Sequence, residues 1–97
     1  MGIFGRILGF NQAPESGVRG TAEVVSASLY RGKGVKAQVE MELDVQIDGQ
    51  ERTRVDFKGM AHRKRWPAAG MTLPVVVDPS DPERIKVEWG AVPEKSA

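Results

Sequence analysis

Apolar and polar residues alternate without a break from residue 35 to residue 47. The apolar positions are Val35, Ala37, Val39, Met41, Leu43, Val45 and Ile47. A period of two does not fit a helix. It turns one side of an extended segment toward a core and the other toward water. The pattern therefore predicts a β-strand about twice the usual length.

Four further segments have the composition or the alternation of strands: 21–30, 51–57, 72–77 and 84–89. Between the third and fourth strands, Met60 to Arg65 could form a turn or two of helix before Pro67 ends it. This order predicts an all-β fold, a small five-stranded barrel of the oligonucleotide/oligosaccharide-binding (OB) type. We expect the barrel over residues 20–90, an N-terminal amphipathic segment and linker over 1–19, and a C-terminal tail over 91–97.

The turn at Asp48-Gly49 decides how the long strand pairs with the next one. A two-residue turn would place apolar Val45 opposite Arg52 and mix the two faces. A three-residue loop over 48–50 keeps the faces apart, with opposite charges facing each other outside. The pairs it predicts are Val45 with Thr53, Leu43 with Val55, Met41 with Phe57, Asp44 with Arg54, and Glu40 with Lys58.

Composition excludes several functions. The chain has 97 residues, a formal net charge of +1 and no cysteine. Its length allows one domain with one core. The balanced charge gives no overall attraction to nucleic acid or anionic membranes. The missing thiols remove disulfides, thiolate nucleophiles and thiolate-bound zinc. We expect no cofactor and no small-molecule substrate.

The N-terminus carries apolar residues at helical spacing: Ile3, Phe4, Ile7 and Leu8. Gly2, Gly5 and Gly9 each weaken a helix by about 1 kcal/mol, so this segment does not support a helix on its own. It is also too short to cross a bilayer. Three alternatives remain: the segment docks on the barrel, lies on a membrane or partner, or is disordered. Its four apolar residues are the candidate contact with a partner or a membrane.

A basic segment from Arg52 to Trp66 suggests a second function. It carries six lysines and arginines, and a basic face with an aromatic ring on an OB-type barrel is typical of single-stranded nucleic-acid binding. Two of these cations, Arg54 and Lys58, are expected to face carboxylates. The candidate nucleic-acid contact is therefore the cluster Arg63, Lys64, Arg65 and Trp66.

Other motifs favour structural readings. Gly32-Lys33-Gly34-Val35-Lys36-Ala37 matches a dinucleotide fingerprint in letters, but a strand follows it where the fingerprint needs a helix. His62 has no second histidine or thiolate with which to share a metal. The acidic stretch 78–83 has the Asp-Pro repeats of a turn and lacks the ligand ladder of a calcium loop. We find no catalytic or metal-binding set and expect no enzyme.

The C-terminal half carries a resemblance. The run from Gly70 to Trp89 contains Val-Asp-Pro-Ser-Asp-Pro before a closing strand, and Gly20-Thr-Ala-Glu-Val-Val precedes the long strand. The chain resembles, over about residues 20 to 89, a group of short bacterial, chiefly actinobacterial, β-domains of unknown function. The resemblance implies a bacterial accessory or scaffold domain, and it does not imply a reaction.

These observations predict a non-enzymatic interaction or scaffold module that binds a protein partner or associates with itself. A membrane surface, reached through the N-terminal segment, and nucleic acid are the other partners considered. The expected location is cytoplasmic or peripheral to a membrane.

Overall fold

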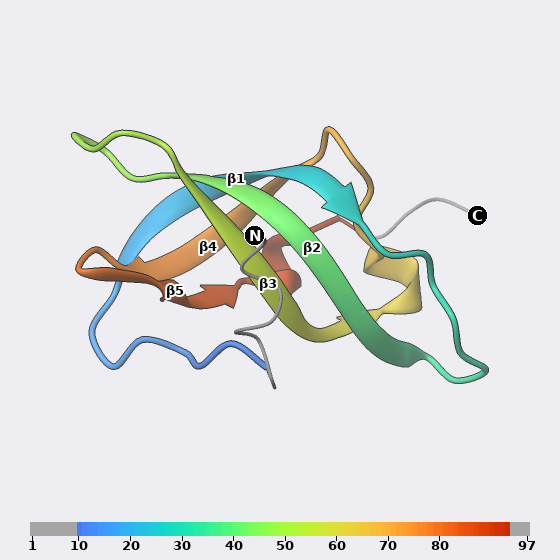
Figure 1. The fold of residues 1–97 in the computed structure, drawn as a ribbon. Helices are drawn as coiled ribbons and strands as arrows, with labels where there is room; N and C mark the ends of the chain where they lie inside the picture. Colours follow the sequence, from blue (N-terminus) through green and yellow to red (C-terminus); the bar gives the residue numbers. More distant parts are fainter. Residues whose placement is uncertain (1–9, 94–97) are drawn as a thin grey trace.

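The computed structural model describes residues 10–93. Figure 1 shows a strongly bent five-stranded sheet with two 3-10 turns among these residues. The elements are β1 (Val18–Ala27), β2 (Lys36–Gln46), β3 (Thr53–His62), η2 (Arg63–Arg65), β4 (Thr72–Asp78), β5 (Asp81–Val87) and η3 (Trp89–Ala91). The all-β prediction is confirmed.

The strands form one antiparallel sheet in the order β3-β2-β1-β4-β5. Its two edges, β3 and β5, curl toward each other until they are in contact. The sheet therefore forms a nearly closed barrel, with a seam between β3 and β5 and the strand order of an OB-type fold. The prediction of an OB-like barrel is confirmed.

All five strands contribute to one core. The largest side chains with almost no exposed surface are Leu43, Leu73, Ile85, Val24, Val39, Val45, Val55, Val75 and Val77. They occupy alternate positions along their strands, as a sheet with one buried face requires. Trp66, just after η2, and Val92, just after η3, add side chains from outside the sheet.

The predicted register of β2 and β3 is confirmed at every pair. Val45 lies opposite Thr53 and Leu43 opposite Val55, while Asp44 lies opposite Arg54 on the outer face. The connecting turn is closed by a bond from the Gln50 amide to the Ile47 carbonyl. Gly49 has a φ of 79° there, a conformation that other residues adopt at a cost.

Several boundaries differ from the sequence prediction: β1 ends at Ala27, before residue 30, and β5 spans Asp81–Val87 where 84–89 was expected. β3 continues to His62, so the expected helical turn is reduced to η2. The strand can continue because Gly59 has no side chain. A β-carbon on Gly59 would lie only 2.7 Å from the Cζ atom of Phe57, so the Phe57 ring leaves no room for a side chain at position 59. β1 begins at Val18, inside the expected linker, and Val92, expected in the tail, is buried. The barrel is thus longer at both ends.

Candidate functional site

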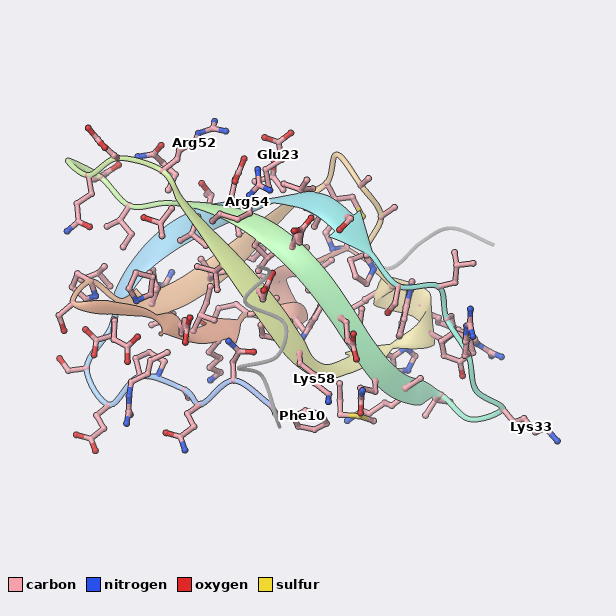
Figure 2. The ribbon with its side chains drawn as sticks, in the orientation of Figure 1. Phe10, Glu23, Lys33, Arg52, Arg54 and Lys58 are labelled. Atoms are coloured by element: carbon pink, nitrogen blue, oxygen red, sulfur yellow. The ribbon has the colours of Figure 1, made fainter. Side chains whose placement is uncertain are left out.

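The four N-terminal residues predicted to contact a partner or membrane (Ile3, Phe4, Ile7 and Leu8) lie outside the described residues. The described chain begins at Phe10, whose side chain is half exposed. In Figure 2, Phe10 lies beside Lys58 near the edge of β3. Phe10, the first described residue, therefore lies at the β3–β5 seam.

Asn11 bridges this seam with both its backbone and its side chain. Its amide N–H donates to the Lys58 carbonyl at 3.1 Å, and its Oδ1 accepts from the Lys58 N–H at 2.8 Å. Its Nδ2 donates to the Asp56 carbonyl at 3.1 Å and to the Glu83 carbonyl at 2.9 Å. Asn11 thus bonds β3 and β5 together where the two strands do not pair directly.

Beyond Asn11 the seam opens into a shallow groove of about 250 Å³. Its lining is mainly apolar: Phe10, Ala13, Phe57, Gly59, Met60, Ile85, Val87 and Trp89, with Asn11, Lys58 and Lys86. Met60 is 43% exposed and Phe10 is 50% exposed, so large apolar surface faces solvent here. The groove therefore offers a binding surface for apolar groups, with two cations among its lining residues.

The backbone along this groove belongs to two sheet edges. Lys58 turns its N–H and carbonyl toward the seam, and backbone direction repeats every two residues along a strand, so Met60 does the same. On β5, the Glu83 carbonyl points toward the seam. The backbone groups of Ile85 and Val87, two and four residues further on, therefore point the same way. Backbone N–H and carbonyl groups at a sheet edge can pair with another extended segment.

Asp56 is a buried carboxylate beside the seam. It is 2% exposed although its neighbours on β3 place it on the outer face, and its Oδ2 atom has no hydrogen-bond partner among the described residues. Burial raises its pKa above the ordinary value, and the negative charges of Glu42 and Glu83 raise it further, against the lowering effect of Arg54. The site therefore disfavours a charge on Asp56.

The outer face of β2 and β3 is the surface that OB-type barrels commonly use for nucleic acid, and here it is occupied by ion pairs. Arg54 Nε lies 2.6 Å from Asp44 Oδ1, a bond that raises the pKa of Arg54. Arg52 Nη1 lies 3.4 Å from Glu23 Oε1. β2 also turns Glu40 and Glu42 toward this face. These carboxylates repel a phosphate backbone.

The predicted nucleic-acid cluster is only partly available. Arg63 and Lys64 are exposed on η2, while Arg65 donates from Nε to the Val92 carbonyl. Trp66 is only 7% exposed, and its Nε1 donates to the Ser28 carbonyl at 2.9 Å. Its ring meets Tyr30 edge-on, with centroids 5.1 Å apart. In this position Trp66 has no free face on which a base could stack.

The remaining motifs have structural roles. His62 Nδ1 accepts from the Lys64 N–H and caps η2. The acidic stretch spans the end of β4, the turn at residues 79 and 80, and the start of β5. Ser80 donates from its hydroxyl and N–H to Asp78 Oδ1 and lowers the pKa of that carboxylate. Within residues 10–93, no three acidic or histidine side chains are grouped to hold a metal ion.

Comparisons with known proteins identify no relative: no family model, no curated protein and no solved structure matches the chain. Among the described residues, no helix is long and apolar enough to cross a bilayer.

Sequence reasoning missed Asn11 and Asp56. Asn11 was placed in the linker, because nothing in a single Asn between a terminal segment and a proline marks it as a bridge between strands. Asp56 alternates with the apolar Val55 and Phe57, which predicts the outer side of the sheet, but alternation does not show what covers a residue there. The apolar residues Phe10 and Met60 were the available signal for the groove, which both of them line once β3 is placed.

Proposed function

We propose that this chain is a non-catalytic interaction module that binds an extended polypeptide segment along the β3–β5 seam. The observation that carries the proposal is that an apolar groove and two sheet edges occur at the same place. Asn11 supports the mode of binding, since it already bonds the Lys58 backbone from both directions, as a residue of an added strand would. Peptide addition to an exposed sheet edge is a recurrent recognition mode.

The groove indicates the chemistry of the partner. Phe10, Met60 and Trp89 favour apolar side chains at alternate positions, since every second residue of an extended segment faces the same way. Lys58 and Lys86, also in the lining, favour a segment that carries carboxylates. The partner is thus an extended, apolar segment with acidic residues.

The N-terminal residues belong to the same proposal. Ile3, Phe4, Ile7 and Leu8 belong to the nine residues that precede Phe10, which itself lines the groove. A partner that engages both would bury more apolar area than the groove alone offers. Self-association through this region is one form of the proposal.

The test is a peptide selection on the immobilised full chain, followed by NMR mapping of the selected peptides. We expect apolar-acidic sequences whose amide shifts fall on Met60, Ile85 and Val87. Met60→Asp should weaken their binding at least tenfold, because it places a repelling charge in the groove. The matched control is Val25→Asp, on β1, since Val25 is 37% exposed and Met60 43%. Selected peptides that bind equally well to the Met60→Asp chain would contradict the proposal.

Deletion of residues 1–9 tests the contribution of the N-terminal segment, and it keeps Asn11 in place. We expect the shortened chain to remain folded and to lose self-association in analytical ultracentrifugation, with weaker binding of the selected peptides. Equal mass and equal binding for both chains would remove the N-terminal residues from the proposal and leave the groove.

Single-stranded nucleic acid remains the alternative function. Its support is now confined to exposed cations near η2, since Arg52 and Arg54 pair with carboxylates and Trp66 is buried. Polarisation of a labelled oligonucleotide at low salt tests it. Binding that falls steeply with salt and on replacing Arg63, Lys64 and Arg65 by alanine would favour it.

A further inference from the structure

Positive charge gathers at one end of the barrel. The chain has 14 Lys and Arg and 13 Asp and Glu. Residues 28–39 and 57–77 hold seven of the 14 and none of the 13. The fold brings these two stretches together: Lys36 pairs with His62, and the Arg63 N–H donates to the Val35 carbonyl at 2.7 Å. We call the exposed residues Arg31, Lys33, Lys36, Arg63 and Lys64 the basic end.

The opposite end of the barrel carries the other sign. The β2–β3 turn holds Asp48 and Glu51 beside Arg52, and Asp78 and Asp81 flank the β4–β5 turn, with Asp81 paired to Arg84. Both turns lie at the end where β2 and β4 finish, whereas the basic end lies where β1 and β3 finish (Figure 1). The charge of the molecule is therefore separated along the barrel, although its net value is close to zero.

The basic end also exposes aliphatic side chains. Leu29 is 75% exposed and Val35 is 58% exposed, and both lie in the loop between β1 and β2. Figure 2 shows Lys33 at the tip of this loop, directed away from the barrel. A projecting loop with aliphatic side chains among lysines and arginines suits a membrane surface. The aliphatic groups can enter the boundary between lipid headgroups and acyl chains, while the cations contact anionic headgroups.

The loop is held in shape by the residues beneath it. The Tyr30 hydroxyl donates to the Gly34 carbonyl across the loop, and Trp66 Nε1 donates to the Ser28 carbonyl at its base. The edge-on contact of Tyr30 with Trp66 joins the two anchors. These contacts organise the loop before binding, so less conformational entropy is lost when a surface is met.

We propose that the basic end of the barrel docks on an anionic lipid surface, with Leu29 and Val35 entering the headgroup layer. Charge complementarity favours lipid phosphates and carboxylates, and the acidic turns at the far end are then directed away from the surface. Lipid is favoured over nucleic acid because the aromatic rings described at this end, Tyr30 and Trp66, are engaged with each other, while the exposed apolar groups are aliphatic. This surface is separate from the β3–β5 groove.

The test is flotation of the full chain with phosphatidylcholine vesicles containing about one-third phosphatidylserine. The variant Arg31→Gln/Lys33→Gln/Lys64→Gln should lose about 100-fold in partitioning, since each cation near the surface contributes roughly fivefold. Leu29→Ser/Val35→Ser should also bind more weakly, and added salt should release the wild-type chain. Arg19→Gln/Arg52→Gln/Lys86→Gln removes three exposed cations elsewhere and should float like the wild type, with the fold of each variant checked by amide NMR spectra.

Three outcomes would overturn the proposal. The first is no flotation of the wild-type chain with these vesicles. The second is flotation that the basic-end variant retains, which would assign lipid binding to another part of the chain, such as residues 3–8. The third is binding of a labelled oligonucleotide that depends on the basic end while the vesicles do not bind. None of these outcomes depends on the peptide selection at the β3–β5 groove.

Discussion

Asn11 bonds Lys58 in both directions, donating from its backbone to the Lys58 carbonyl and accepting the Lys58 N–H with its side chain. The same side chain reaches Glu83 on β5. A residue outside the sheet therefore links the two strands at which the barrel is open.

Asn11→Asp should destabilise the barrel. The carboxylate can still accept from the Lys58 N–H, but it cannot donate to the carbonyls of Asp56 and Glu83, and it adds a negative charge near their side chains. We expect a loss of about 1–3 kcal/mol in the free energy of unfolding, measured with urea. Gln12→Glu adds the same charge at the next, exposed position and should have little effect. A similar loss in both variants would mean that charge, and not the bonds of Asn11, is responsible.

Asp56→Asn should stabilise the protein at neutral pH. The pKa of Asp56 is raised in the folded state, so between the unfolded value of about 3.9 and the folded value the folded state holds more protons. Stability therefore falls as pH rises through that range. The asparagine variant should lack this fall and match the parent at low pH. Asp48→Asn, in an exposed turn, is the control. A less stable Asp56→Asn at neutral pH would show that the fold uses the ionised form.

Gly59→Ala should destabilise β3 by about 1–3 kcal/mol, because the new methyl group would overlap the Phe57 ring. Phe57→Leu shortens that side chain and should recover part of the loss when combined with Gly59→Ala. A double-mutant cycle measures this coupling. Additive effects of the two substitutions would show that the ring does not restrict position 59.

Leu43→Asp should leave the domain unfolded, because it buries an unpaired charge where the native side chain has no exposed surface. Gln38→Asp, an exposed position of the same strand, should remain folded. Amide NMR dispersion and thermal melting distinguish the two. A native spectrum for Leu43→Asp would contradict the strand assignment.

The fold was predictable where a pattern repeats. The alternation around Leu43 predicted the long strand β2, and the requirement that both faces match predicted the β2–β3 register. The end of β3 was predicted too early, at residue 57, whereas the strand continues to His62 past Gly59, which accommodates the Phe57 ring. That contact depends on a rotamer, which a sequence pattern does not encode.

The candidate sites were less predictable, because they depend on segments far apart in sequence. The basic residues on either side of β2 were visible, but their convergence follows from the pairing of Lys36 with His62. The burial of Trp66 follows from its bond to Ser28, 38 positions away. Neither relation has a local signature, so the cluster predicted for nucleic acid included a tryptophan that the fold uses for support.

The partners of the Asn11 side chain lie 45, 47 and 72 positions further along the chain, at Asp56, Lys58 and Glu83. Bonds over such separations form only after the strands that carry them are in place, so they belong to the last stage of folding. Their loss should then accelerate unfolding and leave the refolding rate nearly unchanged. We therefore expect Asn11 to govern the lifetime of the closed barrel and to have little influence on the speed of its assembly.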